Sequence, residues 1–170
     1  KEVYVQEQII YTVKLFYSEA IGGDFPQQPS LPDTVVETLE DEKRYESIIN
    51  GRRYYVLEKS YAIFPQRSGR LDIPRERFNG SRGRGSIFSR KESVSAVSKP
   101  HTILVKTIPA RFSGDDWLPA KDLLIQDSWQ SDLPTFRVGE PVNRSITLSA
   151  VGLLSSALPQ LSEFRLANAK

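Results

Sequence analysis

Hydrophobic residues fall on every second position in several short stretches of the chain. Between residues 7 and 17 the apolar side chains occupy the odd positions: Ile9, Tyr11, Val13, Leu15 and Tyr17. A period of two is typical of a β-strand that buries one face. The same alternation returns at residues 101–108 and 142–150, and no stretch keeps a helical period over more than about two turns. The pattern therefore predicts an all-β protein.

Turn residues separate these stretches. Asn50 and Gly51 lie between two strand-like runs, and Asn-Gly supplies the two positive-φ residues of a type I′ turn, so we expect a hairpin there. The Gly- and Pro-rich segment 21–32 and the basic segment 79–92 are predicted to be loops. Short strands with turn signals at intervals of about ten residues indicate an immunoglobulin-like β-sandwich.

A linker-like stretch divides the chain. Residues 109–116 combine Pro, Gly and paired Asp residues and lack alternation, which is typical of a connection between domains. We therefore predict tandem immunoglobulin-like domains, a first one at residues 1–110 and a second, partial one at residues 111–170 that is truncated at Lys170.

A weak internal repeat supports two domains, because residues of the first recur in the second at a constant offset. At one position the copies differ in a way that matters for the backbone: Gly139 of the second copy favours a tight turn, whereas the first copy has Gln6. We expect the strand to repeat, and the turn only where the glycine stands. The identical pairs are Val5/Val138, Glu7/Glu140 and Leu15/Leu148, and the similar pairs are Ile9/Val142 and Val13/Ile146.

Composition narrows the function by exclusion. No apolar run approaches the roughly 20 residues of a membrane-spanning helix. The 23 basic and 21 acidic side chains leave a net charge of +2, far from the excess expected of a nucleic-acid-binding protein. With no Cys, disulfides and thiolate-bound metals are excluded. The first residues have no signal-peptide pattern, and we expect the chain to be part of something longer.

Candidate catalytic chemistry is sparse. His101 is the only histidine, so a Ser-His-Asp hydrolase would have to use it, and no Gly-x-Ser-x-Gly motif accompanies it. A lone histidine is more often a surface or packing residue. The glycines between Gly80 and Gly85 lack the Lys-Ser/Thr pair of a phosphate-binding loop. We therefore predict neither catalysis nor a cofactor, and keep a cryptic hydrolase as a third possibility.

Acidic and aromatic residues offer binding chemistry. The acidic run Glu37–Glu42 and the pair Asp115-Asp116 lack the spacing of a calcium loop and are predicted to be solvated loops. Trp117 and Trp129 suit either core packing or an interface anchor. Exposed Tyr or Trp rings in a flat strip would favour the alternative function, a carbohydrate-binding module of a secreted enzyme.

An ordered set of motifs carries a resemblance over most of the chain. NGRRY begins at Asn50, YAIFPQRSGRLDIP spans residues 61–74, WLPA begins at Trp117 upstream of Trp129, and VGEP begins at Val138. A last segment with ALP follows at residues 153–161. This order resembles the BatD family of aerotolerance-associated bacterial proteins.

The resemblance implies a periplasmic location and a non-enzymatic role. BatD-like proteins carry tandem immunoglobulin-like domains, with a signal peptide before them and an inner-membrane anchor after them. Their genomic setting includes proteins with von Willebrand A domains and a MoxR-type ATPase, which implies a scaffold that holds other envelope proteins. We expect this chain to be such a binding module.

The expected partner suggests how it docks. Von Willebrand A domains often hold a magnesium ion with an open coordination position, which a carboxylate from another protein can fill. We rank Asp24 first, because Gly22 and Gly23 are expected to present it at a loop tip. The candidate contact residues are Asp24, Asp41, Glu42, Asp115 and Asp116.

Overall fold

The computed structural model describes residues 1–82, 91–129, 137 and 139–160. Over these residues the regular structure is β, apart from a single 3-10 turn, so the all-β prediction is confirmed. The chain forms two compact units, Lys1–Pro109 and Ala110–Lys170, which are called unit 1 and unit 2. That both units are immunoglobulin-like domains stays a prediction.

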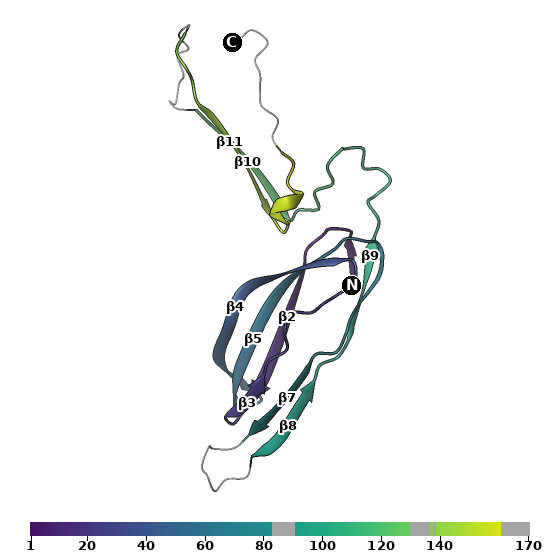
Figure 1. The fold of residues 1–170 in the computed structure, drawn as a ribbon, viewed down its shortest axis with the longest axis vertical. Helices are drawn as coiled ribbons and strands as arrows, with labels where there is room; N and C mark the ends of the chain where they lie inside the picture. Colours follow the sequence, from purple (N-terminus) through teal and green to yellow (C-terminus); the bar gives the residue numbers. More distant parts are fainter. Residues whose placement is uncertain (83–90, 130–136, 138, 161–170) are drawn as a thin grey trace. The chain divides into compact units, whose positions relative to one another are not determined.

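Unit 1 contains nine strands and unit 2 contains two strands and the 3-10 turn among the described residues (Figure 1). The strands of unit 1 are β1 (Glu2–Tyr4), β2 (Ile9–Tyr17), β3 (Ile21–Asp24), β4 (Thr34–Ile49), β5 (Arg52–Pro65), β6 (Gly69–Ile73), β7 (Arg77–Arg82), β8 (Glu92–Val97) and β9 (His101–Lys106). Unit 2 has β10 (Asp122–Trp129), β11 (Arg144–Val151) and η1 (Ser155–Ala157).

The strands of unit 1 form three small sheets. One is antiparallel, in the order β2-β5-β4. The second has the order β1-β9-β6, with β1 parallel to β9, and the third has the order β3-β7-β8. Between the second and third sheets, Ser98 N donates to Glu76 O at 2.9 Å and Glu76 N donates to Ser98 Oγ at 2.8 Å. These bonds join β6–β7 and β8–β9 into one long interrupted ribbon (Figure 1).

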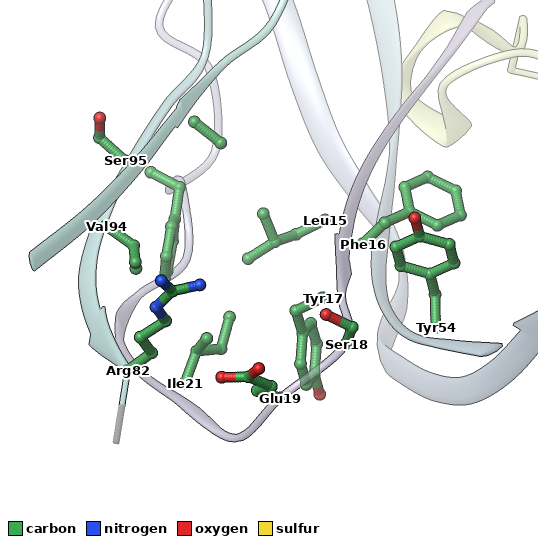
Figure 2. A pocket seen from close by; sticks show the side chains of 12 residues that line it. Leu15, Phe16, Tyr17, Ser18, Glu19, Ile21, Tyr54, Arg82, Val94 and Ser95 are labelled. Atoms are coloured by element: carbon green, nitrogen blue, oxygen red, sulfur yellow. The ribbon is translucent and has the colours of Figure 1, made fainter. Parts of the chain in front are cut away.

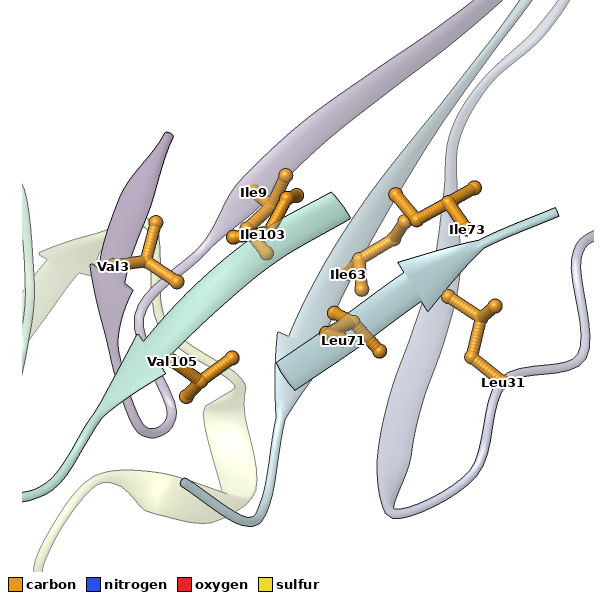
Figure 3. Close-up of a cluster of buried hydrophobic side chains, with 8 residues drawn as sticks. All are labelled: Val3, Ile9, Leu31, Ile63, Leu71, Ile73, Ile103 and Val105. Atoms are coloured by element: carbon orange, nitrogen blue, oxygen red, sulfur yellow. The ribbon is translucent and has the colours of Figure 1, made fainter. Parts of the chain in front are cut away.

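The core of unit 1 lies between the sheet β1-β9-β6 and the sheet β2-β5-β4. The alternation along β2 puts Ile9 inside, where it is 3% exposed, and Ile63 of β5 is fully buried beside it. Burying such aliphatic side chains contributes about 1.5–3 kcal/mol each. Figure 3 shows the cluster: Val3, Ile9, Leu31, Ile63, Leu71, Ile73, Ile103 and Val105.

The β4–β5 hairpin confirms the turn predicted from Asn50 and Gly51. Both residues have positive φ, +51° and +75°, and the flanking pair Ile49 and Arg52 closes the ladder. Asn and Gly tolerate this backbone with little strain, and the turn's twist matches that of the strands.

The acidic run Glu37–Glu42 is wrong as a loop, because it lies inside the long strand β4. The pairing of β4 with β5 shifts register between Thr38 and Glu40 and again between Glu40 and Lys43, as in a β-bulge. Since β4 is an edge strand with both faces largely exposed, charged side chains cost little there.

The segment 21–32 is a loop only in part, because Ile21–Asp24 forms β3 and pairs with β7. Glycine is tolerated because the strands approach closely: a Cβ on Gly23 would lie 2.7 Å from Asn79 O, and one on Gly80 would lie 2.3 Å from Gly22 O. The same contacts place residues 79–82 in β7 instead of the predicted basic loop. Residues 83–90 of that loop lie outside the described residues.

Unit 2 is built on the antiparallel pair β10–β11, whose register runs from Asp122↔Val151 to Trp129↔Arg144. The Arg144 guanidinium donates to both carboxylate oxygens of Asp127, at 2.9 and 2.7 Å, and lies 5.1 Å from the Trp129 ring centre. Trp117 packs edge-on against Phe112 at 5.1 Å. Both tryptophans therefore make packing contacts within unit 2.

The two copies of the predicted repeat begin with the same turn. Glu7 N donates to Tyr4 O at 3.1 Å, and Glu140 N donates to Arg137 O at 3.2 Å, which is the same bond at the same offset. Gln6 has φ +66° and Gly139 has φ +89°, so the expectation that Gln6 would not form this turn is wrong. The Glu7 carboxylate also accepts a bond from Tyr4 N at 2.7 Å, which helps to hold Gln6 in this backbone. Val138 lies outside the described residues.

Candidate functional site

A groove opens between the edge strands β2 and β8 of unit 1. It contains a pocket of about 220 Å³ whose lining is mainly apolar. Figure 2 shows Leu15 of β2 directed into the space between β2 and the strands that carry Arg82 and Val94. The residues that define this β2–β8 groove are Leu15, Phe16, Tyr17, Val94 and Ala96.

The groove continues along β2 toward the core. A second pocket of about 120 Å³ shares Leu15, Phe78 and Ala96 with the first and adds Val13 and Val97. Phe78 lines both pockets and is only 6% exposed, so its ring forms the floor. An apolar channel of this kind is suited to side chains that alternate along an extended segment.

Both strands that border the groove are sheet edges. Among the described strands, β2 pairs only with β5 and β8 pairs only with β7, so neither has a strand on its outer side. β1 does not cover them, because it is three residues long and lies against β9. An uncovered strand edge presents backbone N–H and C=O groups that can pair with another strand. The groove therefore combines apolar side-chain pockets with two edges for backbone pairing.

Charged groups lie at the two ends of the groove. At one end, Arg82 donates through Nε and Nη2 to Glu92, each at 2.9 Å, and this hydrogen bond raises the pKa of Arg82. At the other end, Tyr11 donates its hydroxyl to Glu76 at 3.3 Å. Burial, followed by the Glu76 charge, raises the pKa of Tyr11, so it stays a protonated donor.

His101 lies on β9 and packs edge-on against Tyr11, with ring centres 6.5 Å apart. This is the packing role expected of a lone histidine. The hydrolase alternative requires a serine and a carboxylate beside this ring, and its aromatic neighbour is a phenol instead. The geometry offers that alternative no support.

The carboxylate ranked first is placed differently from the prediction. Asp24 is the last residue of β3 and pairs in register with Asn79, so Gly22 and Gly23 do not present it at a loop tip. These glycines serve the close approach of β3 to β7 instead. Asp24 is nevertheless exposed, so its carboxylate is accessible.

The other candidate carboxylates lie apart in the chain. Asp41 and Glu42 lie at the register shift of β4, where Glu42 forms ion pairs with Arg44 at 2.6 Å and Lys59 at 3.7 Å. Asp41 is exposed, and so are Asp115 and Asp116 of unit 2. No three His or carboxylate side chains gather as a metal site within the part of the chain that is described.

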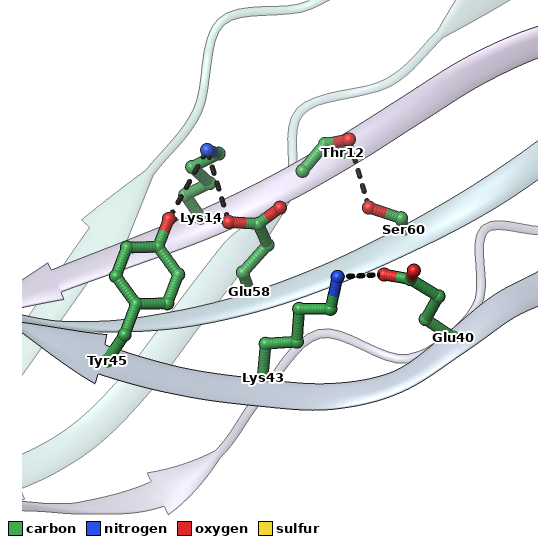
Figure 4. A network of polar contacts seen from close by, with 7 residues as sticks. All are labelled: Thr12, Lys14, Glu40, Lys43, Tyr45, Glu58 and Ser60. Carbon is green, nitrogen blue, oxygen red and sulfur yellow. Dashed lines mark hydrogen bonds and ion pairs between the residues drawn. The ribbon is translucent and has the colours of Figure 1, made fainter.

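The outer face of the sheet β2-β5-β4 contrasts with the groove, because it carries polar contacts (Figure 4). Lys14 lies 3.1 Å from Glu58, and Tyr45 donates its hydroxyl to the same carboxylate. The Tyr45 bond and then the Lys14 bond lower the pKa of Glu58. Thr12 and Ser60 share a bond of 3.1 Å across the same strands. Apolar contact surface is therefore concentrated in the groove.

The aromatic rings beside the groove do not form a flat strip. Phe16 and Tyr54 meet nearly at right angles, 86° between ring planes. Tyr17 and Tyr55 lie 5.6 Å apart and stack on each other. Sugar-binding platforms present coplanar ring faces to the ligand, and these two pairs do not.

Comparison with known protein families, with curated proteins and with solved structures gives no match for this chain. Within the described residues, no helix has the length and apolar character needed to cross a membrane. A function for the chain therefore has to be argued from the groove and from the exposed carboxylates.

Proposed function

We propose that this chain is a non-enzymatic, protein-binding scaffold module from the periplasmic part of a membrane-anchored BatD-like envelope protein. Its partners would be envelope proteins with von Willebrand A domains. The observation that carries the proposal is the β2–β8 groove, in which apolar pockets lie between two uncovered strand edges. Strand addition at such an edge is a common way for β-domains to bind other proteins.

The strand order of unit 1 supports the immunoglobulin-like part of the proposal. The sheet β2-β5-β4 has the order of strands B, E and D in such domains, and β3, β6–β7 and β8–β9 follow as C, F and G. β1, parallel to β9, takes the place of a short first strand beside G. The repeated turn at Gln6 and Gly139 supports a tandem arrangement.

The groove and the carboxylates predict different kinds of contact with the partner. Replacing Val94 or Ala96 with Glu would put a charge in the apolar groove and block strand addition, with about a tenfold or greater loss of affinity. Ile48→Glu is the matched control, because Ile48 is 72% exposed on β4 and does not line the groove. Binding of a von Willebrand A-domain protein of the same envelope is measured by titration calorimetry.

Metal dependence tests the carboxylate contact separately. Asp24→Ala, Asp41→Ala and Asp115→Ala are compared with the unsubstituted chain, with and without magnesium. Asp41 is a better ligand than Glu42, because Arg44 and Lys59 already engage the Glu42 carboxylate. Loss of binding without magnesium and in one of these variants supports coordination. Affinity that ignores the metal, the carboxylates and the groove variants alike would overturn the proposed partner.

A further inference from the structure

The repeat shows what kind of segment fits the β2–β8 groove. β2 and β11 follow the same turn and bury the same set of alternate positions, so they are equivalent strands. In unit 2 an antiparallel strand, β10, covers one edge of β11. In unit 1 no described strand covers the edge of β2 that faces the groove. The strand missing from that edge is therefore one of the β10 type.

The register of β10 on β11 specifies which side chains would meet. Leu148 is equivalent to Leu15, and it pairs with Ile125. By the same offset, Leu123 falls opposite Tyr17 and Leu124 falls opposite Phe16. Three consecutive aliphatic residues thus match the three β2 residues that line the larger pocket.

We propose that β10 of a second copy of this chain occupies the β2–β8 groove and pairs antiparallel with β2. Leu123 and Ile125 enter the pocket beside Val94 and Ala96, while Leu124 packs on Phe16. The inference deepens the proposed function, because it rests on the groove as a site for strand addition and names its occupant.

The condition of β10 supports this occupant. Every residue of β10 is exposed, and Leu123, Leu124 and Ile125 are 45%, 52% and 64% exposed. A two-stranded ribbon is marginally stable by itself, so β10 gains by adding to a larger sheet. Burial of the three aliphatic side chains supplies the driving force.

One residue of β10 fits the groove less well. Asp127 is held by Arg144 in unit 2, but in the groove it falls opposite Val13, and the residue equivalent to Arg144 is Tyr11. A carboxylate there loses its partner without replacement. Replacing Asp127 with Leu should therefore strengthen binding in the groove, whereas it removes the ion pair within unit 2.

Each copy offers one groove and one β10, so the contact is heterologous and leads to concentration-dependent association. The test uses the complete chain and two exposed positions. Phe16→Lys damages the groove and leaves β10 intact, and Leu124→Asp damages β10 and leaves the groove intact. Phe16 is 44% exposed and Leu124 is 52% exposed, so both variants should fold, which circular dichroism checks.

Sedimentation velocity measures the outcome. The unsubstituted chain should associate, and each variant alone should associate at least about tenfold more weakly. A mixture of the two variants should form one-to-one dimers, because it still contains one intact groove and one intact β10. Ile48→Asp, outside both surfaces, should associate like the unsubstituted chain. An unsubstituted chain that stays monomeric at high concentration, or a mixture that does not dimerise, overturns the proposal.

A peptide covering residues 121–130 tests the register directly. It should bind the Leu124→Asp chain, and a peptide with Asp127→Leu should bind at least about tenfold more tightly. If the peptide fails while Val94→Glu still abolishes binding of the von Willebrand A-domain partner, the second-copy inference falls and the proposed function stands. If the chains complement each other but the partner does not bind, the reverse holds.

Discussion

The two ends of unit 1 differ in how completely their sheets are closed, although β2 and β5 run through both. At the packed end, which contains Ile9 and Ile63, side chains from five strands and the segment before β4 form one cluster. At the open end, which contains Leu15 and Phe16, the facing strands leave the β2–β8 groove. Along β2 alone, exposure rises from 3% at Ile9 to 44% at Phe16.

The difference follows from which strands cover each end. At the packed end β1 adds to β9 and contributes Val3, so the sheet facing β2 is three strands wide there. At the open end β8 is the sheet edge, and its Ala96 is too small to reach across to β2. A strand pattern alone therefore does not close a core, because closure needs a covering strand at each position.

The largest expected effect is at the packed end. Ile63→Ala removes a fully buried side chain from the cluster, and it should lower the free energy of unfolding by about 2–5 kcal/mol. Chemical denaturation measures the change. Ile48→Ala, at a position that is 72% exposed, should change it by about 0.5 kcal/mol or less. Equal effects at the two positions would contradict the placement of the core.

At the open end the close approach of β3 to β7 is the sensitive feature. Gly80→Ala places a methyl group 2.3 Å from Gly22 O and against the Phe78 ring, so it should cost about 1–3 kcal/mol. Hydrogen exchange should show faster opening of β3. Gly22→Ala is the matched control, because its nearest contact would be Ser81 Oγ at 3.9 Å. A control that destabilises as much as Gly80→Ala would argue against this packing.

The β4–β5 turn separates backbone effects from packing at either end. Gly51→Val forces a β-branched residue to positive φ where no atom lies within 4 Å, so strain alone should cost about 1 kcal/mol or more. Thermal unfolding measures the loss. Gly51→Asn should be milder, since Asn tolerates this backbone. Unchanged stability in Gly51→Val would mean that the turn relaxes without cost.

The smallest effect lies on the outer face of the sheet. Because the pKa of Glu58 is lowered from its ordinary value of 4.5 by Tyr45 and Lys14, its contribution to stability is present above pH 4.5. That contribution disappears as the pH falls through the lower folded-state pKa. Denaturation midpoints of Glu58→Gln and the unsubstituted chain should therefore differ at pH 7 and converge at strongly acidic pH. A constant difference would contradict the sign.

Local patterns were sufficient for part of the fold. Alternation located β2 and β9, and the Asn50-Gly51 pair located the hairpin, because both signals depend only on neighbours in the chain. The loop predicted at Glu37–Glu42 failed because an exposed edge strand tolerates charge on both faces. The loop predicted at Gly22 and Gly23 failed because the glycines answer to β7, a strand distant in sequence.

The candidate site was less predictable than the fold. Ranking Asp24 by its neighbouring glycines assumed a loop tip, whereas pairing with Asn79 placed it at a strand end. The groove was missed because its lining residues carry no distinctive chemistry. Leu15 and Tyr17 have the same alternation as Ile9, and the small residue Ala96 gives no sign of an opening.

The sequence by itself determined that this protein is built of β-strands, where its tightest hairpin turns, and that residues 4–17 recur in a second copy. These features depend on side-chain alternation and on backbone preferences of single residues. Only the tertiary structure decided which strands became sheet edges, that Gln6 shares the backbone of Gly139, and that β2 is covered at one end and open at the other. Strand pairing between distant segments sets these properties, and no local pattern in the chain encodes it.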